Sequence, residues 1–154
     1  MVASLNTSRP VLDQDARSGQ SRLRSLTAAG TLSQELHDGQ TLYLNNTTGF
    51  ATTLPAALGT GMKLRFFVAA TVSSGSHTIV TAGTDVMKGF AHFFGDDASA
   101  LGGFSTTTAT TITMDGSTRG GFAGDIVELD DVASGIWSVR IYGHATGTEA
   151  TPFS

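Results

Sequence analysis

The stretch that decides the fold is residues 39–68, which read GQTLYLNNTTGFATTLPAALGTGMKLRFFV. Three short runs within it alternate apolar and polar side chains, and each run is closed by a turn of Asn, Thr, Gly or Pro. Alternation places successive side chains on opposite faces of a strand, and it is typical of a sheet with one buried and one wet face. The stretch therefore predicts a β-sheet and carries no catalytic signal.

The clearest strands are residues 62–68 and a pair near the C-terminal end of the chain. In residues 62–68, Met62, Leu64, Phe66 and Val68 share one face, and Lys63, Arg65 and Phe67 share the other. Residues 125–129 lead through a turn at 130–135 into residues 136–143, which predicts a hairpin. In its second strand Trp137, Val139 and Ile141 point to one side, and Ser138, Arg140 and Tyr142 point to the other. One side is expected to be buried and the other to face water or a partner.

The alternating runs amount to about eight short strands, at the spacing expected of a sandwich or a barrel. No apolar stripe of three helical turns occurs. So many short strands must stack or close to protect their edges. We therefore expect an all-β fold over residues 25–143, an antiparallel β-sandwich of jelly-roll type, with an up-and-down β-barrel as the alternative.

Composition limits the classes of function. With 154 residues the chain can bury one core. Its low charged fraction of 14% favours a surface that packs against protein, with a weakly charged soluble protein as the alternative. A net charge of -4 argues against a general nucleic-acid binder, because phosphate binding needs an excess of Lys and Arg. The chain has no cysteine, no long apolar run and no basic-then-apolar start. We therefore expect no disulfide, no membrane span and no export by a signal peptide.

The two ends of the chain are predicted to be appendages. Residues 1–24 follow no clean period and are interpreted as an extended arm, with a disordered terminus as the alternative. This arm carries Arg9, Arg17, Arg22 and Arg24 against Asp13 and Asp15, a local charge of 4 − 2 = +2. Fully extended, it spans roughly 80 Å at about 3.3 Å per residue, enough to reach a neighbouring subunit. Residues 144–154 lack a pattern and are interpreted as a flexible tail.

The sequence contains no motif that predicts an enzyme or a bound cofactor. The four histidines (His37, His77, His92 and His144) are not spaced as metal ligands. The pairs Asp96-Asp97 and Asp130-Asp131 fall in predicted turns, where Asp is favoured for bonding to the local backbone. No nucleotide-binding glycine loop and no Gly-X-Ser-X-Gly elbow occur.

Residues 90–104 differ from their surroundings, because they concentrate aromatic side chains among glycines without a period. They are interpreted as an insertion or a long functional loop. The group contains Phe90, Phe93, Phe94 and Phe104. Such rings either plug one end of a sandwich or serve as interface anchors. Trp137, by contrast, shares its parity with Val139 and Ile141, which favours burial over stacking on a sugar.

The order of several short motifs points to a family. GQTLYLN at 39–45, ATTLPAA at 51–57 and GTGMKLRF at 59–66 are followed by VMKG at 86–89, GDIVEL at 124–129 and IWSV at 136–139. In this order, over residues 25–143, the chain resembles small structural proteins of tailed bacteriophages, and among them the capsid decoration, or cement, proteins.

The resemblance implies a β-sandwich, commonly a homotrimer, that is made in the host bacterial cytoplasm and binds the outer surface of the assembled head. It would bridge neighbouring subunits of the major capsid protein and stabilise the shell. Contacts are expected from Arg9, Arg17, Arg22 and Arg24 of the arm and from Phe93 and Phe94. Similar text also occurs in tail-associated and fibre proteins, so a receptor-binding or carbohydrate-binding module is the alternative. A polysaccharide hydrolase is a further alternative, but it would need clustered acidic residues on a sheet face.

Overall fold

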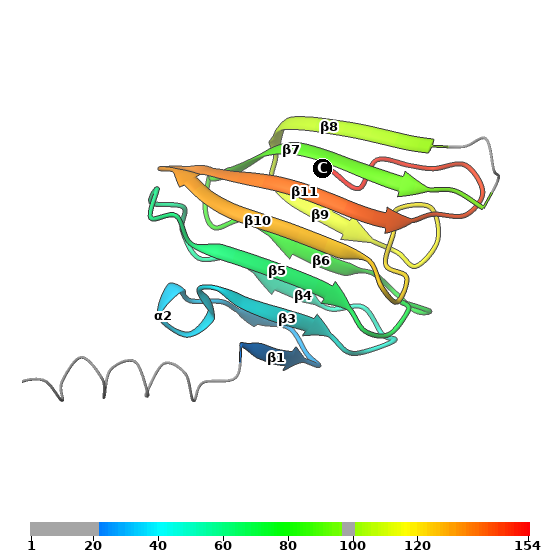
Figure 1. Cartoon of the computed structure of the whole chain (residues 1–154), viewed down its shortest axis with the longest axis horizontal. Coiled ribbons are helices and arrows are strands. Elements are labelled where there is room, and N and C mark those ends of the chain that lie inside the picture. Colours follow the sequence, from blue (N-terminus) through cyan, green and yellow to red (C-terminus); the bar gives the residue numbers. More distant parts are fainter. Residues whose placement is uncertain (1–21, 97–100) are drawn as a thin grey trace, which may run out of the picture.

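The computed structural model describes residues 22–96 and 101–154 and contains two stacked β-sheets (Figure 1). The larger sheet has seven strands in the order β1 (Leu23–Leu26), β3 (Gln40–Leu44), β5 (Lys63–Val68), β10 (Ile126–Ala133), β11 (Ile136–His144), β7 (Val86–Phe94) and β8 (Leu101–Ala109). The smaller sheet has four, in the order β2 (Gly30–Thr31), β4 (Ala51–Thr53), β6 (His77–Val80) and β9 (Thr111–Met114). A single helical turn, α2 (Gln34–His37), lies between β2 and β3 in the chain.

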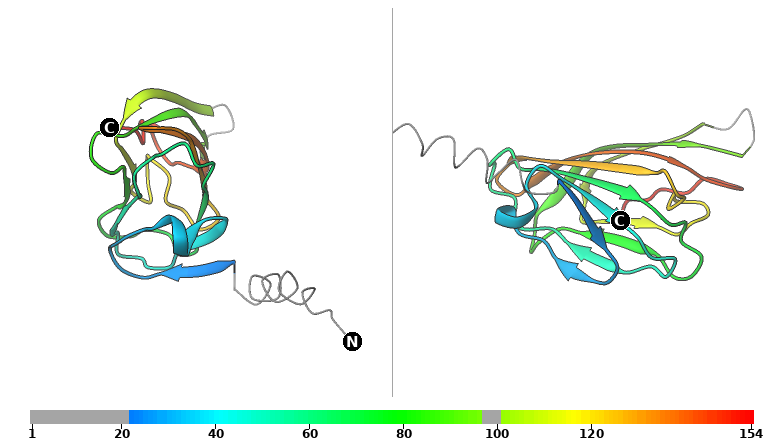
Figure 2. Two further views of the ribbon diagram at one scale, coloured as in Figure 1. Left: turned by 90° about the vertical axis from the view of Figure 1, so that its left-hand side faces the viewer. Right: turned by 60° about the horizontal axis from the view of Figure 1, so that its bottom comes forward.

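The first six strands cross from one sheet to the other at every step. As a result β1, β3 and β5 are parallel neighbours in the larger sheet, and β2, β4 and β6 are parallel neighbours in the smaller one. The later strands form antiparallel pairs (β5 with β10, β10 with β11, β7 with β8 and β6 with β9) and one parallel pair, β11 with β7. Figure 2 shows the two layers from the side.

The predicted β-sandwich arrangement is thus confirmed, but the purely antiparallel jelly roll is wrong, and the two open sheets are not an up-and-down barrel. The physical reason is that alternation along a strand decides which side chains are buried. It does not decide the direction of the neighbouring strand, which is set by connections that carry the chain across to the other layer.

The core lies between the two sheets and is filled as the alternation predicts. The predicted inner faces of β5 and β11 are all buried, and Trp137 is completely covered. Leu42 and Leu44 of β3 and Ile79 of β6 pack into the same cluster. Each fully buried side chain of this size contributes about 1.5–3 kcal/mol by leaving water, so these strands hold the two layers together.

Residues 90–104 are not an insertion or a loop, because most of them belong to two long paired strands, β7 and β8. The period was hidden because Gly102 and Gly103 stand in place of larger side chains and because aromatic rings occupy both faces of β7, with Phe93 buried and Phe90 and Phe94 exposed. Gly89 is required by packing, since a Cβ there would lie 1.9 Å from the carbonyl oxygen of Val139. The strand pairing therefore depends on a residue that breaks the sequence pattern.

Asp130 and Asp131 lie within β10, so their predicted place in a turn is wrong. The Asp131 carboxylate is buried and accepts hydrogen bonds from the backbone N–H groups of Leu58 (3.1 Å), Gly59 (2.7 Å) and Thr60 (2.9 Å) and from the Thr60 hydroxyl (2.8 Å). Burial acts to raise the pKa of this carboxyl, but the hydrogen bonds from residues 58–60 outweigh it and lower the pKa below its usual value. The carboxylate thereby ties the loop before β5 to β10.

The last residues of the chain complete the smaller sheet. The N–H of Thr113 donates to the Pro152 carbonyl (2.8 Å), and Ser154 exchanges two backbone hydrogen bonds with Thr111 (2.9 and 3.0 Å). Phe153 is buried in the core. Residues 152–154 thus cover the outer edge of β9, although the sequence predicted this segment to be a flexible tail. No helix in the described residues is long and apolar enough to cross a membrane.

Candidate functional site

The candidate site is the outer face of the seven-stranded sheet, which points away from the smaller sheet (Figure 2). One row of side chains crosses five strands at matched register positions: Tyr43 of β3, Phe67 of β5, Ile126 of β10, Tyr142 of β11 and His92 of β7. We call these five residues the aromatic row. They face outward, because their neighbours along each strand are buried.

The rings of this face contact one another. The Tyr43 and Phe67 ring centroids are 5.1 Å apart, and Phe90 lies 5.4 Å from His92 and 6.3 Å from Tyr142 in edge-to-face geometry. Tyr142 is 41% exposed and Phe90 37% exposed. Neighbouring rings that remain in solvent are enriched at protein interfaces, where their burial contributes binding free energy. The aromatic row is therefore suited to contact with a partner.

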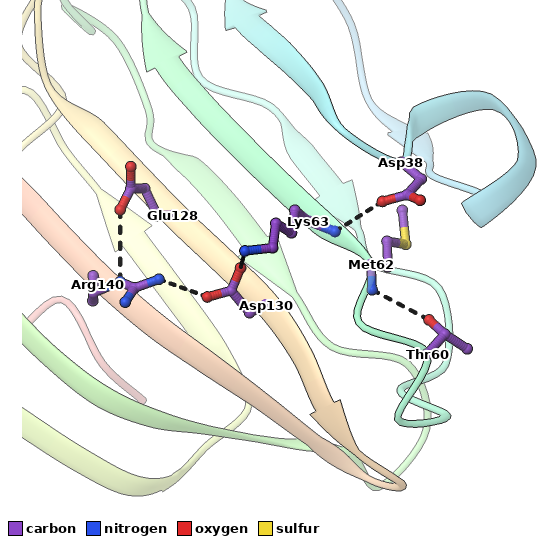
Figure 3. A network of polar contacts seen from close by, with 7 residues as sticks. All are labelled: Asp38, Thr60, Met62, Lys63, Glu128, Asp130 and Arg140. Atoms are coloured by element: carbon purple, nitrogen blue, oxygen red, sulfur yellow. Dashed lines mark hydrogen bonds and ion pairs between the residues drawn. The ribbon is translucent and has the colours of Figure 1, made fainter.

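A group of charged side chains lies beside the aromatic row on the same face. It consists of Lys63, Arg65, Lys88, Glu128, Asp130 and Arg140, which we call the charged group, and its members lie in two rows across β5, β10, β11 and β7. Figure 3 shows its centre, where Arg140 donates from Nη2 to Asp130 and its Nε is 3.6 Å from a Glu128 carboxylate oxygen. Lys63 Nζ lies 3.9 Å from Asp130 on the other side.

The charged group carries four cations and two anions, a local charge of +2 on a chain whose net charge is -4. Its ion pairs are partly exposed, so each stabilises the fold by at most about 1 kcal/mol. A shallow hollow of about 290 Å³ lies over the group, with Gln40, Thr41 and Arg65 among its lining residues. This arrangement favours polar contact with a surface that carries carboxylates, rather than enclosure of a small substrate.

A second hollow, of about 360 Å³, lies where β7 and β11 end. There the buried Asp125 carboxylate accepts from the backbone N–H groups of Gly121 (2.8 Å) and Phe122 (3.0 Å) and from His144 Nδ1 (2.8 Å). The exposed Phe94 ring lies 6.3 Å from the His144 ring. Because three of the four hydrogen bonds of Asp125 come from the backbone, His144 N among them, this carboxylate holds a turn in place.

Of the predicted arm contacts, Arg9 and Arg17 lie outside the described residues. Arg22 and Arg24 are exposed, and Arg24 belongs to β1 rather than to an arm. Arg24 borders a hollow beside α2 and β2, on the opposite side of the sheet from the aromatic row.

The two predicted phenylalanine contacts separate in the structure. Phe93 is buried and packs 6.0 Å from Phe104, so it plugs the sandwich and is not available to a partner. Phe94 is 57% exposed and remains available. The sequence did not predict that His92, Phe67 and Tyr43 belong to one surface. The only signal was that each alternates with apolar residues in its own strand, which places its side chain on the outward face.

His77 is a structural histidine. Its ring is buried, Nδ1 accepts from the Phe50 N–H (3.3 Å), and Nε2 lies 3.1 Å from the Asn46 carbonyl oxygen. Since a backbone N–H can only donate, Nδ1 carries no proton and Nε2 donates to Asn46. Burial lowers the pKa of His77, and the Asn46 carbonyl offsets part of this effect.

In the described part of the chain no group of three His, Asp or Glu side chains is arranged to hold a metal ion. Comparison with known protein families and with curated proteins found no match to the chain.

Proposed function

We propose that the protein is a non-enzymatic decoration protein of a tailed-bacteriophage capsid. It binds the outer surface of the assembled head and bridges neighbouring major capsid subunits. The resemblance in the order of its motifs motivates this role. The observation that supports it most is the aromatic row beside the charged group, because together they form a broad outward face suited to protein contact.

The protein would stabilise the shell because it binds the assembled shell more tightly than it binds loose capsid subunits. A protein that contacts two neighbouring subunits at once binds the assembled shell more tightly than it binds loose subunits. The shell is then stabilised by the difference in binding free energy. Weak individual contacts suffice, since engagement of several sites adds avidity without new chemistry. The excess of positive charge in the charged group selects a capsid surface that carries carboxylates.

Co-sedimentation with assembled heads tests this role. The heads are made from the major capsid protein of the same genome, and Tyr142→Ala is compared with Leu58→Ala. Tyr142 belongs to the aromatic row and is 41% exposed, whereas Leu58 is also a large, exposed side chain (66%) but lies in the loop before β5. We expect Tyr142→Ala to weaken binding by about tenfold or more, as at an interface hot spot, and Leu58→Ala to have no effect. Equal binding by both variants and the wild type excludes the aromatic row as the contact surface.

A carbohydrate-binding module of a tail fibre is the second candidate. The exposed rings of Phe90 and Tyr142 favour it, because sugar rings stack on exposed aromatic faces. Trp137 does not contribute, since it is completely buried. A glycan array separates the two roles. Capsid decoration predicts no glycan binding. Binding to a defined glycan that is lost in Tyr142→Ala would support the carbohydrate-binding module instead of the decoration protein.

A further inference from the structure

The second hollow, at the ends of β7 and β11, continues the outward face beyond the aromatic row. His144 of β11 stands at the same register position as Phe94 of β7, next along these strands after the outward pair of Tyr142 and His92. Both side chains are accessible, since Phe94 is 57% exposed and the side chain of His144 is 59% exposed. The hollow that they line is therefore part of the outward face.

The imidazole of His144 presents a hydrogen-bond acceptor in this hollow. Its Nδ1 lies 2.8 Å from the buried Asp125 carboxylate. Because a carboxylate can only accept, Nδ1 carries the proton, and Nε2 of the neutral ring keeps a lone pair. No hydrogen bond to this Nε2 occurs among the described residues. A carboxylate behind an imidazole fixes its orientation and makes the other ring nitrogen a stronger acceptor.

The rest of the hollow combines aromatic rings with a negative charge. The ring centroids of Phe94 and Phe122 lie 6.3 and 6.5 Å from that of His144. The Asp96 carboxylate also lines the hollow, with its two oxygens 3.3 and 3.4 Å from the backbone N–H of Gly147. Within the described ranges no Lys or Arg lines the hollow, and no ion pair to Asp96 occurs. The hollow thus offers acceptors and π-faces to a ligand but no cation of its own.

We propose that the second hollow receives an arginine side chain of the protein that the outward face contacts. A guanidinium is planar and carries several N–H donors. It can stack on the exposed Phe94 ring while its edge donates to His144 Nε2 and to Asp96. A lysine ammonium is more strongly hydrated and has no plane to stack, and a tyrosine hydroxyl brings a single donor and no charge to Asp96. Charge complementarity therefore selects arginine.

An arginine in this hollow would also orient the partner, because the two ends of the outward face differ in charge. The charged group has a local charge of +2, whereas the hollow carries Asp96 with Asp125 behind it. Arg140 of the charged group and His144 lie on the same strand, about 13 Å apart at about 3.3 Å per residue. A partner that presents carboxylates at one end and an arginine at the other is favoured in one orientation. The identity of this partner as a capsid rests on the function proposed above.

Binding of N-acetyl-arginine amide tests the hollow without any capsid. The matched probe is N-acetyl-citrulline amide, which has nearly the same shape but no charge. Backbone amide chemical shifts of the isotope-labelled full chain are followed at about pH 8, at the upper end of the range in which histidine usually titrates. We expect saturable shifts at residues 94–96, 122–123 and 144–146 with the arginine probe, and about tenfold weaker binding of the citrulline probe. Equal affinities, no shifts, or shifts confined to the charged group overturn the proposal.

Two variants locate the binding site. Phe94→Leu removes the ring but keeps an apolar side chain, and Asp96→Asn removes the charge while its amide oxygen can still accept from Gly147. Each is expected to lower the affinity for the arginine probe about fivefold. The control is Glu35→Gln, which changes the net charge as Asp96→Asn does but lies exposed in α2, at the other end of the molecule (Figure 1). The same loss in Glu35→Gln as in Asp96→Asn would contradict a defined site, and the emission of buried Trp137 shows whether each variant is folded.

Co-sedimentation with heads then separates this inference from the proposed function. We expect Asp96→Asn to weaken attachment about fivefold and Glu35→Gln to leave it unchanged. If Asp96→Asn attaches like the wild type while Tyr142→Ala attaches weakly, the inference fails and the decoration role stands. If the arginine probe binds the hollow but the wild type does not sediment with heads, the arginine site stands and the decoration role fails.

Discussion

Replacing Asp131 tests how the loop before β5 is held against β10. Its buried carboxylate accepts four hydrogen bonds from residues 58–60, three from backbone N–H groups and one from the Thr60 hydroxyl. In Asp131→Ala all four are lost. Residues 58–60 are exposed, so water replaces part of the bonding, and each lost bond is expected to cost about 1 kcal/mol. The free energy of unfolding should therefore fall by about 4 kcal/mol.

Asp131→Asn provides the graded comparison, because the side chain keeps its shape. The amide retains one acceptor oxygen, but its NH₂ group then faces at least one N–H donor of the loop. One carboxylate oxygen accepts only the Gly59 N–H, so placing the NH₂ group there breaks the fewest hydrogen bonds. The free energy of unfolding is therefore expected to fall by about 1–2 kcal/mol. Both variants leave the buried apolar side chains of β5 and β10 unchanged.

The assay is urea unfolding at a fixed protein concentration, followed by the emission of Trp137, the only tryptophan. Trp137 is completely buried, so its emission reports loss of the core. We expect the midpoint to fall in the order wild type, Asp131→Asn, Asp131→Ala, with an unchanged slope. A loss below about 1 kcal/mol for Asp131→Ala would refute the view that this carboxylate ties the loop to β10.

Four further outcomes are expected. Burial in the folded state lowers the pKa of His77 and so favours its neutral form. The contribution of His77 to the free energy of unfolding should therefore be full above pH 6.5 and should fall as the pH drops from 6.5 towards the lowered folded-state pKa. Thermal unfolding of His77→Gln, measured over the same pH range, should lack this step. The pKa of Asp131 is lowered on folding, so its carboxylate should stabilise the fold above about pH 4 and lose this effect as the pH falls through the folded-state pKa. The difference in unfolding free energy between the wild type and Asp131→Asn, measured against pH, checks this. Gly89→Ala should prevent stable folding, since its Cβ would overlap the Val139 carbonyl, and a native Trp137 emission would contradict this. Arg140→Met should change the free energy of unfolding by less than about 1 kcal/mol, because its ion pairs are partly exposed, while weakening attachment to heads.

Strands with strict alternation could be predicted from the sequence, and strands without it could not. The inner face of β5 and the Trp137 face of β11 were predicted correctly, because burial on one side imposes a period of two. In β7 and β8 a register shift and glycines removed that period, although each strand has nine residues, as many as β11. The direction of neighbouring strands was also not predictable, since it is set by the connections that carry the chain from one sheet to the other, and no local pattern encodes these.

The candidate surface was predictable only in pieces. The outward parity of Tyr142 and Arg140 follows from their alternation with buried neighbours. Their alignment with His92 and Phe67 depends on the order of strands in the sheet, which no local pattern encodes. Asp131 was assigned to a turn because adjacent Asp residues favour turns locally, whereas its partners lie about 70 residues away in the chain.

The proposed location on the head surface is tested most directly by a cryo-EM map of the phage particle that carries this protein. The proposal predicts repeated density over the outer shell that fits the two-sheet domain, with the aromatic row and the charged group of each copy turned towards a junction between capsid subunits. Density for the domain on the tail or its fibres, with none on the head, would contradict it.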